Sequence, residues 1–215
     1  GIYPIVAGAV DGERKKRLLE HIKNPKEMWS AAGVSAVDMS ASYYFDDGYW
    51  NGNVWMSHQW FIWKTMLDNG EADFAFDIAK RALDMWKDET DFTYNTYECF
   101  GIATKRGGWF HNFGGLSAPI CIWANAYFKP QTVTTGFDVW TDYQKTSDIG
   151  AEVKFKYFGN CDKYTMVVTL SDKADYVAYL DGEKVDFNER NKGSLEFTFD
   201  ENVKGGVLEI KEKQE

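Results

Sequence analysis

Residues 49 to 60 bring flat aromatic rings and amide groups together. The sequence YWNGNVWMSHQW holds three tryptophans, two asparagines, one histidine and one glutamine. Sugar rings stack their C–H faces on aromatic rings and bond their hydroxyls to amides and carboxylates. The stretch therefore predicts one wall of a saccharide pocket, with these candidate residues: Trp50, Asn51, Gly52, Asn53, Trp55, His58 and Gln59. The alternative is a tryptophan-rich core in which His58 and Gln59 bond internally.

A second stretch, TYNTYECFG at residues 93–101, places Glu98 among aromatic side chains, directly after Tyr97. A carboxylate in such a setting is either solvated at the surface or buried for a purpose, because burying an unpaired charge is costly. The stretch has neither a helical nor a strand period, so we expect a loop. Glu98 and Tyr97 are candidate site residues, and Cys99 is a weaker candidate nucleophile.

A third stretch, RGGWFHNFGGLSAPI at residues 106–120, carries paired glycines on both sides of an aromatic segment. Glycine lets the backbone bend tightly and approach a ligand closely. Trp109 and Phe113 are therefore candidate sugar contacts, whereas His111 has no partner at the spacing of metal ligands. No phosphate-binding, dinucleotide-binding or zinc motif occurs in the sequence, so we expect neither a metal nor a cofactor.

The composition limits the classes of partner. The net charge of -9 and the pI near 4.9 disfavour nucleic acid and anionic membranes. No apolar run is long enough to span a bilayer, and no signal segment opens the chain, so we expect a soluble protein whose compartment the sequence does not indicate. Three cysteines without a CxxC spacing support neither a disulfide framework nor a zinc site.

Apolar periodicity predicts helices in the first part of the chain. We expect a short surface helix over 14–22, a nearly all-apolar helix over 53–67, an amphipathic helix over 72–86 and a second apolar helix over 117–128. Inner apolar helices that alternate with outer amphipathic ones are what a helical barrel of two layers requires. We therefore predict a mainly α-helical, partial (α/α)6 toroid-type barrel over residues 1–129.

Residues 130–215 read instead as antiparallel strands. AEVKFKYF and SLEFTFD alternate apolar and polar residues, and YVAYL-DG-EKVDF is a hairpin whose Asp181 and Gly182 suit a two-residue turn. About six strands would form a small β-sandwich domain. We expect its role to be structural, because the sequence shows no exposed aromatic ladder.

The order of these pieces resembles the C-terminal half of clan G glycoside hydrolases, the family 63 glucosidases and their trehalase-like and mannosylglycerate-hydrolase-like relatives. The matching elements are YWNGNVW at 49–55, Tyr97-Glu98, FGGL at 113–116 and the opening GIYPIVAGAV. They span about residues 1–128. The family usually has Arg at the position of Asn51 and Pro at that of Asn53.

The resemblance implies an inverting, α-glucosidase-like hydrolase of α-linked sugars, with Glu98 as the general base that activates water. The general acid would be an Asp in the preceding half of the enzyme. Asp38, Asp46 and Asp47 lie too near the YW segment in the sequence to match the position of the acid in the family. The chain would then be a C-terminal fragment, inactive alone, whose partners are an oligosaccharide or glycoside substrate and the missing N-terminal half. Exposed inner helices would favour a homodimer.

Two other functions remain open. A complete protein of this size would be a non-catalytic carbohydrate-binding or interaction module. An isomerase or epimerase on a similar scaffold would need a histidine pair, for which His58 and His111 are the candidates.

Overall fold

The computed structural model describes residues 1–213 and divides into two compact units. The first unit comprises Gly1–Trp63 and Asp73–Trp123, and the second comprises Lys64–Ala72 and the residues from Ala124 onward. The predicted boundary between residues 129 and 130 divides the sequence once. The two units are instead defined by contacts in space, and each is made of two separate segments of the chain. That boundary stays a prediction.

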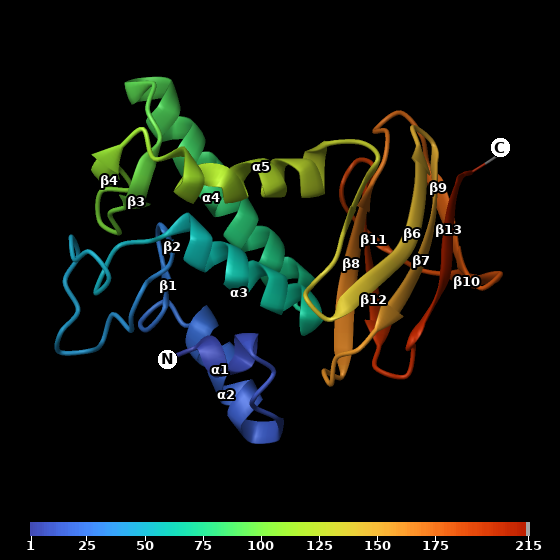
Figure 1. Cartoon of the computed structure of the whole chain (residues 1–215), viewed down its shortest axis with the longest axis horizontal. Coiled ribbons are helices and arrows are strands. Elements are labelled where there is room, and N and C mark those ends of the chain that lie inside the picture. The colour runs from blue at the N-terminus through green and yellow to red at the C-terminus, as the bar shows by residue number, and fades with distance from the viewer. Residues whose placement is uncertain (214–215) are drawn as a thin grey trace. The chain divides into compact units, whose positions relative to one another are not determined.

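Five helices occur in the described residues (Figure 1). They are α1 (Tyr3–Val6), α2 (Gly12–Lys23), α3 (Met56–Asp68), α4 (Ala72–Thr93) and α5 (Gly114–Phe128). The apolar and amphipathic patterns predicted four of them, and α4 runs a further two turns beyond its predicted end. Among residues 1–213, no helix combines the length and the apolar character needed to cross a bilayer.

The expectation of a mainly helical, toroid-type barrel is wrong. Helices hold 31% of the chain and strands 32%, so the fold is mixed. The prediction treated the nearly apolar helices as the inner layer of a ring. In the first unit, α3 and α5 bury their apolar side chains against each other and their surroundings: the rings of Trp63 and Trp123 meet edge to face at 6.3 Å, and both are fully buried.

Four short strands of the first unit form two hairpins, which no periodic signal predicts. They are β1 (Trp29–Ser30), β2 (Gly33–Val34), β3 (Tyr97–Phe100) and β4 (Gly107–His111). β1 pairs with β2 and β3 pairs with β4, both antiparallel. The second hairpin is the one that carries Glu98.

The second unit holds two antiparallel sheets. Their spatial orders are β10-β9-β13-β7-β6 and β11-β12-β8-β5. The strands are β5 (Thr132–Thr134), β6 (Val139–Ser147), β7 (Gly150–Tyr157), β8 (Lys163–Thr169), β9 (Tyr176–Leu180), β10 (Glu183–Val185), β11 (Asn188–Asn191), β12 (Ser194–Asp200) and β13 (Gly205–Glu212).

Alternation of apolar and polar residues explains how the two sheets share one core. Inward residues of both sheets, including Val153, Phe155, Tyr164 and Phe197, are buried in a single apolar cluster. The turn between β9 and β10 has positive φ at Asp181 and Gly182, as the hairpin prediction requires. The longest strand, β6, lies at the edge of its sheet and was not among the predicted strands.

Candidate active site

Glu98 lies in strand β3 and is buried, with 6% of its surface exposed. The expected loop is in fact a strand whose alternation is broken by a register shift between Tyr97 and Cys99. Phe100 fixes the other end of the strand, because it exchanges two backbone hydrogen bonds of 2.8 and 2.9 Å with Val54. This pairing places Glu98 beside the segment that leads into α3.

The carboxylate of Glu98 is held on one side. The hydroxyl of Tyr49 donates a hydrogen bond to Oε1 of Glu98, and this bond raises the pKa of Tyr49 to about 12. The phenol therefore stays protonated and keeps donating at neutral pH. Oε2 of Glu98 is buried and makes no hydrogen bond within residues 1–213. One oxygen is therefore held by Tyr49, and the other has no hydrogen bond within the described residues.

Aromatic rings surround Tyr49. Its ring meets Trp55 edge to face at 4.8 Å and Trp109 at a tilted 4.7 Å, while Trp50 stacks on Trp55 with ring centroids 3.7 Å apart and planes at 7°. Trp55 is buried, but Trp50 and Trp109 are 51% and 59% exposed. The cluster thus presents two exposed indole rings beside a buried carboxylate.

The segment 51–53 serves mainly to shape this loop. The Asn51 side chain donates to the carbonyl of Tyr43 at 2.8 Å. A Cβ on Gly52 would lie 1.8 Å from the carbonyl oxygen of Phe45, so only glycine fits there. Asn53 donates to Sγ of Cys99 at 3.2 Å, and its buried Oδ1 has no hydrogen-bond partner within residues 1–213.

Asn53 also lines a cavity of about 320 Å³. The other lining residues are Asp47, Gly101, Thr104, Arg106, Gly107, Gly108 and Trp109. Glu98 does not line it, whereas Trp109 lines it and also contacts Tyr49. The cavity and the carboxylate are therefore linked through the Trp109 ring.

His58 and Gln59 make internal contacts instead. Nδ1 of His58 lies 2.8 Å from the hydroxyl of Tyr3, and burial lowers the pKa of His58 to about 4, so the ring is neutral at pH 7. The amide of Gln59 binds both the N–H and the carbonyl of Val34, at 2.8 and 2.6 Å, and so holds the β1–β2 hairpin. The predicted role of these two residues in sugar binding gains no support from these contacts.

Tyr97 and Phe113 lie at the two margins of the β3–β4 hairpin. The ring of Tyr97 covers Gly107, where an added Cβ would come within 2.2 Å of it. The N–H of Phe113 donates to the carbonyl of Thr96 at 3.4 Å, which joins the entry to α5 with the start of β3. Phe113 is 40% exposed.

The other candidate reactive groups of the first unit are Cys99 and two of the histidines. Burial raises the pKa of the Cys99 thiol to about 11, which leaves little thiolate for nucleophilic attack. His58 lies in α3 and His111 in β4, and no contact recorded within residues 1–213 joins them as an acid–base pair. The same residues contain no group of three or more His, Cys, Asp or Glu side chains placed to hold a metal ion.

Sequence reasoning missed two supports of the site. Tyr49 belongs to the YW motif, but its contact with Glu98 spans 49 positions and has no local signal. Glu89, at the end of α4, is buried and accepts hydrogen bonds from Arg106 at 2.5 and 3.2 Å and from the N–H of Gly107 at 3.0 Å. Glu89 and Arg106 thereby fasten the β3–β4 hairpin to α4.

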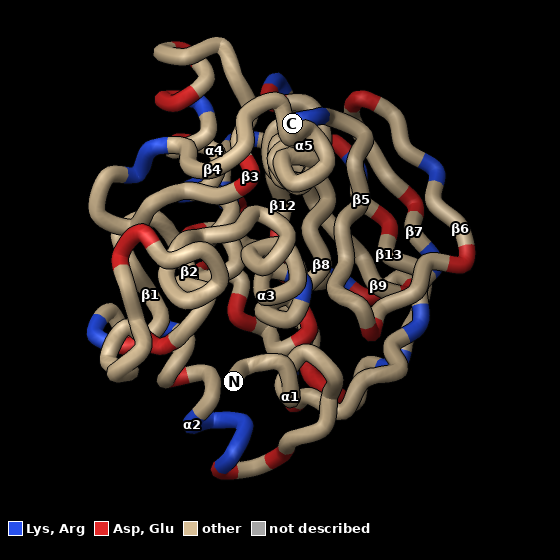
Figure 2. The backbone as a smooth tube through the Cα atoms, turned by 60° about the vertical axis from the view of Figure 1, so that its left-hand side comes forward, with Lys and Arg blue, Asp and Glu red and all other residues tan. Residues whose placement is uncertain are grey.

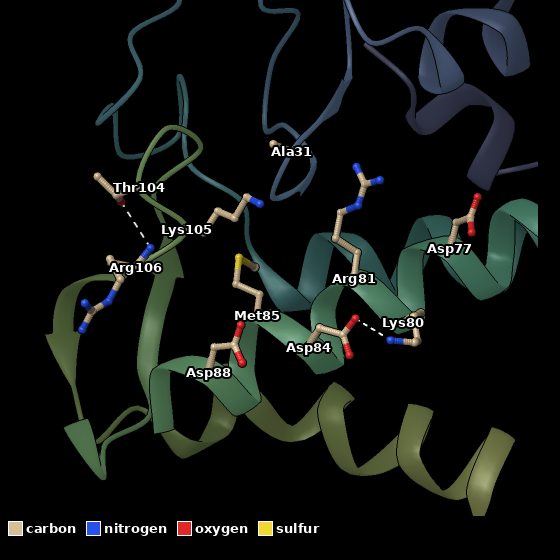
Figure 3. Close-up of a pocket in the computed structure, with 10 residues that line it drawn as sticks. All are labelled: Ala31, Asp77, Lys80, Arg81, Asp84, Met85, Asp88, Thr104, Lys105 and Arg106. Atoms are coloured by element: carbon tan, nitrogen blue, oxygen red, sulfur yellow. Dashed lines mark hydrogen bonds and ion pairs between the residues drawn. The ribbon is translucent and has the colours of Figure 1, made fainter. Parts of the chain in front are cut away.

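A larger cavity of about 640 Å³ lies along α4 (Figure 3). Its lining is charged: Lys80 pairs with Asp84, and Arg81 donates to the carbonyl of Ser30 and covers the ring of Trp29 at 3.9 Å. No aromatic side chain lines it. The features of a sugar site therefore gather around Glu98 rather than in this cavity.

Comparison with known proteins identifies the family of the first part. Residues 1–107 match the model of the mannosylglycerate hydrolase MGH1-like glycoside hydrolase domain. No curated protein matches the chain. A solved structure of an uncharacterized conserved protein from Thermus thermophilus is 22% identical, with a TM-score of 0.50, and the match covers 58% of this chain and 30% of that chain.

Two further structures are of the GH63 mannosylglycerate hydrolase from the same organism, in complex with glucose and with Tris. Their identities are 22% and 21% and their TM-scores 0.49 and 0.46, and each match covers 57% of this chain and 28% of that chain. The present chain thus spans less than a third of the length of these three solved structures. Residues 1–107 of the chain belong to the MGH1-like family of glycoside hydrolase domains.

Proposed function

We propose that this chain is the C-terminal part of an inverting glycoside hydrolase that acts on α-linked sugars, and that Glu98 is its general base. One observation carries the proposal: Glu98 is buried, Tyr49 holds one of its oxygens, and the other oxygen has no hydrogen bond within residues 1–213. Membership of residues 1–107 in a glycoside hydrolase family supports the reaction class.

In the proposed mechanism, the unbonded oxygen of Glu98 takes a proton from a water molecule as that water attacks the anomeric carbon. Tyr49 fixes the plane of the carboxylate throughout, since its raised pKa keeps it a donor. Inversion needs a second carboxyl group about 6.5 to 9.5 Å away to protonate the leaving oxygen. We assign that acid to residues upstream of Gly1 in the same enzyme.

The aromatic cluster supports a sugar as the substrate. Trp50 and Trp109 are exposed indole rings fixed by Trp55 and Tyr49, so sugar binding would order few side chains. Exposed apolar side chains on α3 and α5, Phe61 at 38% and Ile122 at 41%, support a contact with the upstream part of the enzyme or with a second copy. The specificity for a sugar and for a linkage would depend on residues of that upstream part as well as on the aromatic cluster.

The test is a comparison of Glu98→Gln with wild type in the longer protein that includes the upstream residues. Turnover of a 4-nitrophenyl α-glucoside or α-mannoside should fall by at least about 10³-fold, because the amide cannot accept the proton. Binding of the free sugar should change little. Asp91→Asn, at an exposed carboxylate of α4, is the matched control and should retain turnover.

Several outcomes would reject parts of the proposal. Retained turnover in Glu98→Gln would remove the base assignment, and a product released with retained anomeric configuration, read by proton NMR, would remove inversion. Hydrolysis by the present chain alone would reject its assignment as an incomplete enzyme. Saturable sugar binding without turnover in both proteins, lost in Trp50→Ala, would instead favour a binding module.

A further inference from the structure

Three exposed aromatic side chains of the second unit lie on β6 and directly after β7. Trp140 is 65% exposed, Phe158 64% and Tyr143 38%. We call these three residues the aromatic strip. Strand β6, which carries two of them, was not predicted from the sequence, which shows no aromatic ladder.

Strand register places the whole strip on one face of the sheet. Val139 pairs with Tyr157, and both are buried in the core, so the next pair, Trp140 and Lys156, points outward. Phe158 follows Tyr157 and therefore points outward too. Figure 1 shows β6 and β7 running side by side in this sheet.

A β-bulge is what brings Tyr143 onto this face. Regular alternation from Trp140 would turn residue 143 inward, but the register shifts between Thr141 and Tyr143, and Tyr143 pairs with the exposed Lys154. A bulge that re-aims one side chain is a common device next to binding sites. Its effect here is to align the aromatic residues on a single surface.

Polar side chains border the aromatic strip, and hydrogen bonds and ion pairs hold them in place. The rings of Trp140 and Phe158 lie 5.4 Å apart, edge to face. Tyr143 donates to Glu152 at 2.7 Å, and Lys156 pairs with Asp142 at 3.1 Å. Figure 2 shows the mixed charges along β6 and β7.

We propose that the aromatic strip binds a neutral oligosaccharide, at a site separate from that of Glu98. Sugar rings would stack on Trp140 and Phe158 through their C–H faces, and their hydroxyls would bond to Asp142, Lys156 and Glu152. Because each aromatic residue has charged neighbours, the surface suits a ligand that carries apolar faces and hydroxyls together.

Other occupants fit this surface less well. The centre of a protein interface is depleted of charged residues, whereas this strip is interleaved with them. Pairing of β6 with the edge of a second copy is opposed by the bulge and by exposed charges such as Lys145, which are devices that keep sheet edges apart. The net charge of -9 opposes nucleic acid.

The test uses the whole chain and three probes: hexamers of α-1,4-linked glucose, β-1,4-linked glucose and β-1,4-linked mannose. Isothermal titration should show saturable binding of at least one of them. Trp140→Ala and Phe158→Ala should each weaken that binding about tenfold or more, equivalent to about 1.4 kcal/mol. Trp140→Phe, which keeps an aromatic ring, should weaken it less than Trp140→Ala.

Controls separate this site from the candidate active site. Tyr94→Ala, which removes an aromatic side chain that is 89% exposed in the first unit, should leave binding unchanged. Trp50→Ala and Glu98→Gln should also leave binding at the strip intact, so failure of the hydrolase proposal would not affect this result. Circular dichroism checks that each variant is folded.

The proposal is overturned if the wild type shows saturable binding of none of the three hexamers. It is also overturned if Trp140→Ala and Phe158→Ala, both folded, bind as tightly as wild type. A wild-type dimer in sedimentation that becomes a monomer in Trp140→Ala would show that a second copy covers the strip, and this too would overturn the proposal.

Discussion

The hydroxyl of Tyr49 donates a hydrogen bond to Oε1 of Glu98, and so joins the loop before α3 to strand β3. The two residues are 49 positions apart in the sequence. Because Tyr49 also packs against Trp55 and Trp109, it sets the carboxylate and the aromatic cluster in one arrangement. Tyr49 is therefore a positioning residue for Glu98.

Tyr49→Phe should lower turnover in the longer enzyme while the site keeps its shape. The phenylalanine ring preserves packing on Trp55, but Glu98 loses the donor that fixes its plane. We expect kcat to fall roughly 10- to 100-fold, with KM changed little, because misorientation affects the chemical step. Steady-state kinetics measures the two parameters separately.

The matched control for this variant is Tyr44→Phe. Tyr44 lies in the same loop region and donates to Asp46 at 2.7 Å, at an exposed site. The Tyr44→Phe substitution should leave kcat unchanged. An unchanged kcat in Tyr49→Phe, or an equal loss in both variants, would contradict the positioning role.

Arg106→Ala should destabilise the first unit. It leaves the buried carboxylate of Glu89 with the N–H of Gly107 but without its two bonds to the guanidinium. The expected loss is about 1–3 kcal/mol in the free energy of unfolding, measured by urea denaturation. Lys87→Ala, which breaks an exposed pair with Asp91, is the control and should cost less than about 0.5 kcal/mol.

The pH dependence of this contribution has a definite sign. Burial acts to raise the pKa of Glu89, but the hydrogen bonds from Arg106 and Gly107 outweigh it and leave the pKa below its ordinary value. Its stabilising contribution is therefore present at neutral pH and is lost as the pH falls through the lowered pKa. An effect of Arg106→Ala as large in acid as at pH 7 would contradict this account.

The sequence identified Glu98 through its aromatic setting and through the order of motifs, but it could not reveal how Glu98 is held. Strand β3 has four residues and a register shift, so no alternation could build up, and the partner that matters lies 49 positions away. The contacts of Gln59 are hidden from the sequence for a similar reason. Its hydrogen-bond partner, Val34, lies in a strand of two residues, which is too short to show an alternating pattern in the sequence.

Strand β6 shows the same limit in the second unit. Apart from the buried Val139 and the half-buried Thr146, its residues are exposed on both faces, because it lies at the edge of its sheet, and a bulge interrupts its alternation. The strands β7 and β12, whose apolar residues alternate with polar ones, were predicted correctly, although Glu196 on the polar face of β12 is buried. Periodicity therefore found the strands that build the core and missed the one that carries the aromatic strip.

The buried His58 should make the first unit less stable in acid. Its pKa is about 4 in the folded chain, and burial is the main cause, whereas an unfolded chain takes up this proton near 6.5. Stability should therefore fall as the pH drops from about 6.5 to about 4, by about 2–3 kcal/mol in total. Tryptophan fluorescence in urea between pH 7 and 4 measures this loss.

His58→Asn should flatten this dependence, although loss of packing would lower stability at pH 7. His111→Asn, at the exposed end of β4, should keep the wild-type slope. The interpretation fails if His58→Asn loses stability on acidification as steeply as wild type does.

Asp68 should make the second unit respond to pH in the opposite direction. Its carboxylate accepts hydrogen bonds from the N–H groups of Phe137 and Asp138, at 2.8 and 3.0 Å, yet burial still raises its pKa to about 6. The folded unit then holds a proton that the unfolded chain has already lost. Its stability should rise as the pH falls from about 6 towards the unfolded pKa near 4.

The opposing slopes require a measurement that resolves the units, since a single transition could look flat. Hydrogen exchange in increasing denaturant, followed on peptides from β7 and β8, reports the second unit alone. Asp68→Asn should remove most of the gain in stability on acidification, because an amide does not titrate. Asp138→Asn should remove a smaller part, since burial also raises the pKa of Asp138. A gain that persists undiminished in Asp68→Asn would assign the proton to another group and would contradict this account.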